Sequence, residues 1–399
     1  SVSAIPDAST NFDETATNTF TAVDNSNSTI VFLDTSEDLN LTGLGGDDTI
    51  SSGSGDDTIV GGDGNDMIRA GKGADDISGG GGDDVIVLIG TTTAGQYDAS
   101  DITSPTGSGV DLSPVLSLES LNGQTTSEVS AGETIDGGAG NNTIYVYGTV
   151  DLTGVTLTNV EVIYISSEVT LTPDQLAGFT TINGDGSSII NIVVPEGGEY
   201  IIDLTAIDIS GIAEIHVDGN VTFIVENMAD LAGIANISAE PGSIINLEIT
   251  DQDQLHDLTL EEIWTIFDQV VVKEFNDDSY SDYIIYTDRG NFEEDAGSGL
   301  ISSILQSKVN SPFLYLVGDQ TGQNVFNVDL SSYDLTGLRN IFLSENGLEK
   351  ITLTKQNIID WEARDFFSPR ITVFGSDNDV MNTDFDTTVD AINDSFVNA

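Results

Sequence analysis

The most regular stretch of the chain begins Gly43-Leu-Gly-Gly-Asp-Asp-Thr-Ile-Ser51 and repeats every nine residues to Val87. Each of its consecutive copies has Asp at the sixth position and Ile at the eighth. The later copies read Ser52-Gly-Ser-Gly-Asp-Asp-Thr-Ile-Val60, Gly61-Gly-Asp-Gly-Asn-Asp-Met-Ile-Arg69, Ala70-Gly-Lys-Gly-Ala-Asp-Asp-Ile-Ser78 and Gly79-Gly-Gly-Gly-Asp-Asp-Val-Ile-Val87.

This spacing predicts a coil of short strands joined by tight turns. Glycines at the first, second and fourth positions permit turns with positive φ and leave backbone carbonyls uncovered. The last three residues of each copy are expected to form a strand with its Ile pointing inward. Two copies complete one coil, so each copy stacks on the next but one at about 4.8 Å. Asp48, Asp66 and Asp84 then form one column, and Asp57 and Asp75 form another.

Stacked carboxylates need a counter-ion, because two of them at that spacing repel by about 3 kcal/mol at an effective dielectric of about 20. Calcium takes six to eight oxygen ligands at about 2.3 to 2.6 Å and suits carboxylates with turn carbonyls, whereas magnesium demands a tighter octahedron. We therefore predict several bound calcium ions; the alternative is a flexible acidic Gly/Asp linker. The predicted metal-site residues are the sixth-position Asp48, Asp57, Asp66, Asp75 and Asp84, the further acids Asp47, Asp56, Asp63 and Asp83, and the turn glycines Gly62, Gly64, Gly71, Gly73, Gly80 and Gly82.

The block matches the pattern G-G-x-G-x-D-x-U-x and resembles the RTX (repeats-in-toxin) family of secreted calcium-binding proteins from Gram-negative bacteria. The resemblance implies type I export in an unfolded state, folding in the higher calcium outside the cell, and an extracellular or cell-surface location. RTX proteins include toxins, lipases, proteases, adhesins and surface-layer proteins. The repeats therefore indicate a means of folding and a location, and they leave the activity open.

The charge balance excludes several classes of function. Lys+Arg 10 against Asp+Glu 67 gives a formal net charge of −57, and no Lys or Arg occurs from Gly73 to Val272. A basic surface for nucleic acid or an anionic membrane is therefore absent from the sequence. Cys 0 excludes disulfides and thiol chemistry. No apolar run of about 18 residues predicts a membrane-spanning helix.

A second, longer repeat follows the block. A lone nonapeptide from Gly137 to Tyr145 has Asn142 at its sixth position, which predicts a turn or a weak calcium site. Related segments then begin at Val150, Ile202 and Val328, each with Asp-Leu-Thr or Asp-Leu-Ser after the first residue. Their short β-branched runs between Gly, Asn and Asp turns predict stacked strands. Thr172-Pro-Asp-Gln175 is a capping box that predicts one helical turn.

A leucine-rich repeat is the rival interpretation, because residues 338–346 fit the core L-x-x-L-x-L-x-x-N. Such repeats recur every 20–29 residues, whereas Asp151 and Asp203 are 52 residues apart. The spacing therefore favours a parallel β-solenoid with larger, irregular coils.

The predicted fold class is all-β: a calcium β-roll followed by a parallel β-solenoid, with one short helix. That helix is expected at Leu260 to Val270, where Thr259 and Glu262 form a capping box. The predicted segments are an N-terminal segment (1–42), the β-roll (43–90), a Ser/Thr/Gly-rich loop or insertion (91–130), a β-solenoid (131–250), a helical junction (251–272) and a C-terminal β-solenoid (273–399).

The stretch L-T-x-x-x-L-T-x-V-E-x-I is also similar to the lattice-forming region of RTX surface-layer proteins and large RTX adhesins, over residues 131–250 with an echo at 328–382. This resemblance favours a structural protein without enzymatic activity. Its expected partners are further copies of the same chain, in a lattice or filament, and cell-surface polysaccharide is a further possible partner. An adhesin module that binds a surface or glycan is the alternative.

A polysaccharide-active β-helix enzyme is the remote alternative, because such enzymes use Lys or Arg, or a Tyr/His pair, in a groove. Tyr145, Tyr147 and Tyr164 keep it open. His216 is expected to be a packed or surface strand residue, and His256 a loop residue.

Overall fold

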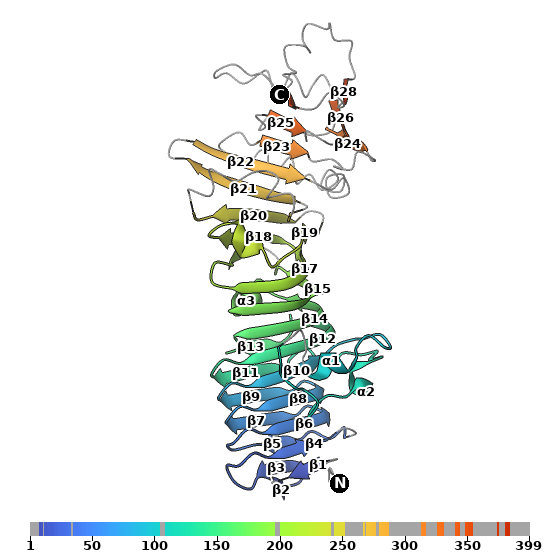
Figure 1. Cartoon of the computed structure of the whole chain (residues 1–399), viewed down its shortest axis with the longest axis vertical. Helices are drawn as coiled ribbons and strands as arrows, with labels where there is room; N and C mark the ends of the chain where they lie inside the picture. The colour runs from blue at the N-terminus through green and yellow to red at the C-terminus, as the bar shows by residue number, and fades with distance from the viewer. Residues whose placement is uncertain are drawn as a thin grey trace. The chain divides into compact units, whose positions relative to one another are not determined.

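Most of the described chain forms β-strands, and most of these pair in parallel (Figure 1). The computed structural model describes residues 8–251 apart from 11, 33–34, 104–107, 196–199 and 241–242. Beyond 251 it describes residues 266–267, 269–276, 279–286, 313–316, 325–330, 340–343, 348–353, 373–374 and 380–383. The chain divides into two compact units, the first holding residues 1–193, 202–215 and 232–234.

The nonapeptide block folds as a roll of two facing sheets, and the parallel β-solenoid predicted from the sequence is confirmed. Ile50 lies beside Ile68, and Ile59 beside Ile77, so two copies complete one coil as expected. Every Ile at the eighth position is 0% exposed, which makes these side chains the core of the roll. The strands of the block are β6 (Thr49–Ser54), β7 (Thr58–Asp63), β8 (Met67–Lys72), β9 (Asp76–Gly81) and β10 (Val85–Ile89).

These strands are longer than the expected three residues because each continues into the next copy. Gly53 pairs with Gly71 and Gly62 with Gly80, so the first glycines of a copy are still part of a strand. The tight turn is thereby confined to the middle of each copy.

The segment before Gly43 supplies the first coils of the same roll. Strands β3 (Thr19–Ala22) and β5 (Asn40–Thr42) continue one sheet in parallel, and β4 (Thr29–Val31) continues the other. At this end β1 (Ala8–Thr10) and β2 (Phe12–Ala16) run antiparallel to their neighbours.

Beyond the block the coils lengthen and the first unit keeps its two sheets. In one, the strand order is β1-β4-β6-β8-β10-β12-β14-β15; in the other it is β13-β11-β9-β7-β5-β3-β2. The additional strands are β11 (Thr134–Ala139), β12 (Thr143–Asp151), β13 (Thr156–Thr158), β14 (Val162–Leu171) and β15 (Thr181–Val193).

The longer repeat recurs in the structure as a common corner. The Oδ1 atom of Asp151 accepts from the Thr153 N–H at 2.9 Å, and that of Asp203 accepts from the Thr205 N–H at 3.0 Å. The Leu that follows each Asp is 0% exposed. The predicted capping box is also present: helix α3 (Pro173–Ala177) begins after Thr172, and Gln175 donates to the Leu152 carbonyl at 2.7 Å.

Most strands of the second unit form two further sheets, ordered β18-β20-β21-β22-β23-β25-β27 and β24-β26-β28. Strands β16 (Tyr200–Asp203) and β17 (Asp208–Asp218) contribute residues to both units. The other elements are β18 (Asn220–Val225), η2 (Met228–Leu231), β19 (Ile237–Ala239), β20 (Ile244–Ile249), β21 (Gln269–Asn276), β22 (Ser279–Tyr286), β23 (Phe313–Leu316), β24 (Val325–Asp329), β25 (Asn340–Leu343), β26 (Leu348–Leu353), β27 (Val373–Phe374) and β28 (Val380–Thr383).

The predicted helix from Leu260 is wrong at its C-terminal end. Gln269 and Val270 begin strand β21, and Phe267 forms a β-bridge with Ile237. The remainder, residues 260–265, lies outside the described residues, as does His256. No helix in the described part of the chain has the length and apolarity to cross a membrane.

The Ser/Thr/Gly-rich segment, residues 91–130, forms an insertion between β10 and β11. It contains helices α1 (Ala99–Thr103) and α2 (Leu118–Leu121), which the sequence did not predict. Its apolar side chains cover the outer face of β10 and β12. That small core consists of Val87, Ile89, Tyr97, Ile102, Leu112, Val115, Leu116, Leu121, Tyr145 and Tyr147.

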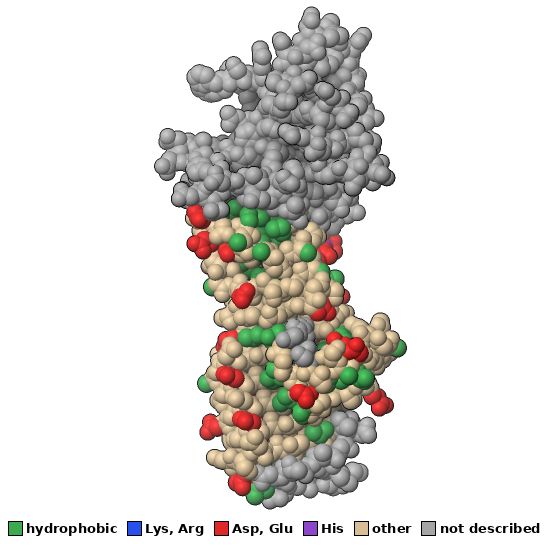
Figure 2. All heavy atoms as spheres, in the orientation of Figure 1, with side chains coloured by type: hydrophobic (Ala, Val, Ile, Leu, Met, Phe, Trp, Pro, Cys, Tyr) green, Lys and Arg blue, Asp and Glu red, His purple; other side chains and the backbone are tan. Residues whose placement is uncertain are grey.

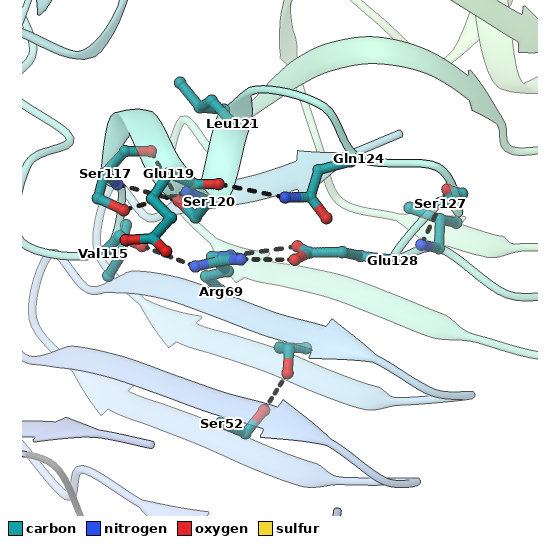
Figure 3. A network of polar contacts seen from close by, with 12 residues as sticks. Ser52, Arg69, Val115, Ser117, Glu119, Ser120, Leu121, Gln124, Ser127 and Glu128 are labelled. Carbon is teal, nitrogen blue, oxygen red and sulfur yellow. Dashed lines mark hydrogen bonds and ion pairs between the residues drawn. The ribbon is translucent and has the colours of Figure 1, made fainter. Parts of the chain in front are cut away.

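A buried ion pair joins the insertion to the roll (Figure 3). Arg69 on β8 donates from Nε and Nη2 to the two carboxylate oxygens of Glu128 at 3.1 and 2.5 Å, and from Nη1 to the Val115 carbonyl at 3.1 Å. The two side chains are only 11% and 8% exposed. Arg69 and Lys72 are the only Lys or Arg residues before Lys273, and Arg69 forms this junction.

Arg69→Met is expected to release the insertion, because removing one partner of a buried pair leaves an uncompensated charge at a cost of about 3 to 5 kcal/mol. Hydrogen exchange with calcium present should show faster exchange across residues 91–130. Lys72→Met, at an exposed position on the same strand, is the control and should leave that exchange unchanged. Equal protection of the insertion in R69M and wild type would contradict this role.

Candidate metal centre

The sixth-position aspartates point inward in two columns, as the spacing predicts. We call Asp48, Asp66 and Asp84 the long inner column, and Asp57 and Asp75 the short inner column. All five side chains are buried, with residue exposures of 0 to 2%. Each is held by a backbone N–H of the preceding coil: Asp66 Oδ1 accepts from Asp48 and Asp84 Oδ1 from Asp66, both at 2.8 Å. The Asp75 Oδ1 atom accepts from Asp57 in the same way.

The second oxygen of each carboxylate has no hydrogen-bond donor. Among the described residues, the buried side-chain oxygens and nitrogens without a partner are the Oδ2 atoms of these five aspartates and Asn18 Oδ1. Leaving a buried acceptor unsatisfied costs about 1 to 3 kcal/mol, and more when the group is charged. A repeated set of such atoms indicates a cation-binding site.

In the long inner column, each Oδ2 atom faces a backbone carbonyl of the next coil. A Cβ placed on Gly43 would come within 3.0 Å of both Asp48 Oδ2 and the Gly61 carbonyl oxygen. The same holds at Gly61 for Asp66 Oδ2 and the Gly79 carbonyl, and at Gly79 for Asp84 Oδ2 and the Gly137 carbonyl. Glycine at the first position therefore leaves open a space that is lined by two acceptors.

Burial shifts the pKa values of these carboxyl groups upward. Desolvation is the largest cause throughout: it raises the pKa of Asp66 and Asp75 to about 7, that of Asp57 and Asp84 to about 6, and that of Asp48 above its usual range. Repulsion from Asp48 and Asp84 adds to the effect at Asp66. At neutral pH the charged column is thus unfavourable without a counter-ion.

These residues fit calcium. The donors are carboxylate and carbonyl oxygens, which a hard cation of large coordination number prefers. Bound calcium would neutralise the carboxylates and give each pair of facing acceptors a common partner. Within the described residues no group of three or more His, Cys, Asp or Glu side chains surrounds one point. The carbonyls of Gly61, Gly79 and Gly137, which face the Oδ2 atoms, would supply further oxygen ligands.

The predicted turn glycines have the backbone that the sequence required. Gly62, Gly64, Gly71, Gly73, Gly80 and Gly82 have φ values from 92° to 147°. At Gly62, for example, a Cβ would also collide with the Leu44 carbonyl.

The additional acids lie apart from the inner columns. Asp47, Asp56, Asp63 and Asp83 are all exposed. The Oδ1 atoms of Asp47, Asp56 and Asp83 accept backbone N–H groups of the following coil, from Asn65, Ala74 and Asn141. Their side chains thus point along the roll in the opposite direction to the inner columns. Their predicted part in metal binding stays a prediction.

Glu133 is a buried acid that the sequence analysis missed. It lies beside Asp75 in the adjacent coil, because Thr134 pairs with Asp76. It is 2% exposed, and desolvation, with repulsion from Asp75 and Glu128, raises its pKa to about 8. The signal was present in Gly132-Glu133-Thr134-Ile135, which matches Gly55 to Ile59 without one aspartate.

Asn142 occupies the sixth position in the next coil of the long inner column. Its Oδ1 atom accepts from the Asp84 N–H at 3.0 Å, as an aspartate does in the earlier coils. Its Nδ2 atom donates to the Asn159 carbonyl at 3.0 Å. Both halves of this side chain therefore have partners.

The tyrosines considered for catalysis lie under the insertion. Tyr145 and Tyr147 are 2% and 1% exposed, and Tyr145 stacks on Tyr164 with ring centroids 4.8 Å apart. Tyr147 donates to the Asp101 carbonyl of the insertion. The rings of Tyr145 and Tyr147 therefore belong to the core beneath the insertion. The Nδ1 atom of His216 on β17 lies 2.7 Å from the Ser238 hydroxyl oxygen on β19, so His216 is a packed strand residue.

Comparison with known proteins agrees with this geometry. The family model of the RTX calcium-binding nonapeptide repeat matches residues 40–68, 51–86 and 130–151. The last match includes Glu133 and Asn142. No curated protein and no solved structure matches the chain.

Gly61→Ala is expected to remove one calcium ion, because the new methyl group fills the space between Asp66 Oδ2 and the Gly79 carbonyl. Gly81→Ala is the matched control: its Cβ meets only Asp63 Oδ1, at 3.6 Å. Titration calorimetry should show one ion fewer in G61A and an unchanged count in G81A. The same count in both variants would contradict the assigned site.

Calcium-depleted protein should fold better in mild acid than at neutral pH. The folded-state pKa values of Asp57, Asp66, Asp75 and Asp84 lie above the usual 3.8. These four carboxyl groups therefore contribute their full stability to the fold below pH 3.8, and that contribution is lost as the pH rises through about 6 to 7. Circular dichroism of depleted protein should show roll structure decreasing over that interval. The double variant D66N/D84N should show a weaker pH dependence, and an unchanged profile would argue against these groups.

Proposed function

We propose that this RTX-repeat protein is a secreted structural protein that calcium folds, and that copies of it assemble into a surface layer or filament on a Gram-negative bacterium. RTX nonapeptide repeats bind calcium and are typical of secreted proteins of such bacteria. The assembled state, the cell-surface location and any surface polysaccharide partner are the further steps that we propose.

The inner columns carry the calcium part of the proposal. Their Oδ2 atoms are buried, lack donors and, in the long column, face carbonyls of the next coil. A chain with this arrangement gains little by folding where calcium is scarce. Where calcium is abundant, each bound ion stabilises the folded state by mass action, since the unfolded chain offers no such site.

The charge of the surface supports calcium-dependent assembly. A net charge of −57 makes copies repel one another unless cations intervene. Carboxylates are spread over the described part of the face in Figure 2. Exposed Asp47 and Asp83 on one edge of the roll, and Asp56 on the other, add acids to its outside. Calcium held between acidic faces would turn repulsion into attraction and link assembly to folding.

Electron microscopy and analytical ultracentrifugation of the full chain, with calcium and then with excess chelator, test the proposal. Sheets or filaments that form in calcium and dissolve in chelator are expected, because both folding and contacts between copies need the ion. Magnesium at equal ionic strength is the control for simple charge screening. Monomers in calcium at every concentration would overturn the assembly, and monomers that bind cell-surface glycan would favour an adhesin module.

A further inference from the structure

Four successive coils present the same contact with different chemistry. In the first three, an aspartate Oδ2 atom faces a carbonyl oxygen of the next coil, at Gly43, Gly61 and Gly79. In the fourth, at Gly137, a Cβ would come within 3.0 Å of Asn142 Nδ2 and of the Asn159 carbonyl. The backbone arrangement is thus retained while the acceptor at the sixth position is replaced by a donor.

We propose that the Asn142 amide takes the place of a calcium ion and ends the calcium column, so that the coils from β12 to β15 fold without calcium and serve as the template for the calcium-dependent roll. The inference rests on the proposed calcium-dependent folding, and it adds the position in the chain at which folding ceases to depend on calcium. It assigns Asn142 a structural role as a built-in substitute for the cation.

The hydrogen bonds fix the orientation of the amide. Because Asn142 Oδ1 accepts from the Asp84 N–H, its Nδ2 group must face the Asn159 carbonyl, to which it donates at 3.0 Å. The charge of the side chain is zero, so no counter-ion is needed. In this coil a neutral hydrogen bond joins Asn142 to the Asn159 carbonyl. At the same position in the three earlier coils, a carboxylate Oδ2 atom and a carbonyl oxygen face each other.

The coils after Asn142 have no further demand for a cation among the described residues. No buried side-chain oxygen or nitrogen beyond Asp84 lacks a partner there. Glu161 is the next residue in register, and its carboxylate accepts a hydrogen bond from the Asn142 N–H at 2.7 Å. On the short inner column, the residue in register after Glu133 is Val155, which is apolar.

The apolar core of these coils is also larger than that of the roll. A coil of the roll buries one Ile from each nonapeptide. Strand β14 alone buries Val162, Ile163, Ile165, Val169 and Leu171. Since burial of each such side chain contributes about 1.5 to 3 kcal/mol, apolar burial stabilises these coils more than it stabilises the nonapeptide coils. The exposed edge of β12 can then pair with β10 once calcium neutralises the columns.

Hydrogen exchange of the full chain in calcium and in chelator tests this division. Peptides within Thr143–Val193 are expected to keep their protection in chelator, while peptides within Thr49–Ile89 lose it and regain it on addition of calcium. Loss of protection in both regions together, or retention in both, would overturn the proposal.

Asn142→Asp is the gain-of-site variant and Asp84→Asn its reciprocal. N142D should bind one more calcium ion than wild type by titration calorimetry, and protection of β12 and β14 should become calcium-dependent. D84N should bind one ion fewer. If N142D folds in calcium and binds no more ions than wild type, the inference is overturned. If N142D does not fold, D84N decides instead, and an ion count in D84N equal to that of wild type would overturn the inference. A wild-type chain that binds no calcium would instead overturn the proposed function itself.

Discussion

The structure depends on a contact that is unfavourable by itself: a buried carboxylate oxygen that faces a carbonyl oxygen of the neighbouring coil. Most folds avoid opposing acceptors, and this one repeats them along the long inner column from Asp48 to Asp84. The backbone N–H bonds to Oδ1 align the column but leave Oδ2 without a partner. A cation shared by both oxygens changes the sign of the interaction, so the folded state is defined together with its ions.

The repeat register was predictable because every nonapeptide makes the same demand. An Asp at the sixth position and an Ile at the eighth can both be satisfied only when alternate copies stack, and the pairing of Ile50 with Ile68 follows. The solenoid after the roll was predictable for a similar reason, since the Asp-Leu-Thr corner at Asp151 recurs at Asp203. In each case local sequence and long-range packing require the same arrangement.

The errors and omissions lie where long-range contacts decide. The Thr-x-x-Glu capping box predicted a helix to Val270, but strand pairing of β21 takes Gln269 and Val270, and tertiary context overrides propensity. The insertion has a loop-like composition, yet its apolar residues meet on the face of β10 and β12. The inner role of Glu133 was missed because the insertion separates it from the copy that it continues. The difference between the paired Asn142 amide and the unpaired Asp84 Oδ2 depends on contacts with neighbouring coils, which lie far away in the sequence.

The insertion also shows that the register of a coil does not depend on the length of chain between coils. The chain leaves the roll after Ile89 and returns where the Glu128 N–H donates to the Ile89 carbonyl, so the departure and the return are adjacent. The next strand, β11, then pairs with β9 in the register that a chain without the detour would have. Coils are therefore added by pairing with the coil before, and the length of chain between them is free to vary. A solenoid of this kind can gain or exchange whole surface modules at such a junction while its axis and its ion positions stay unchanged.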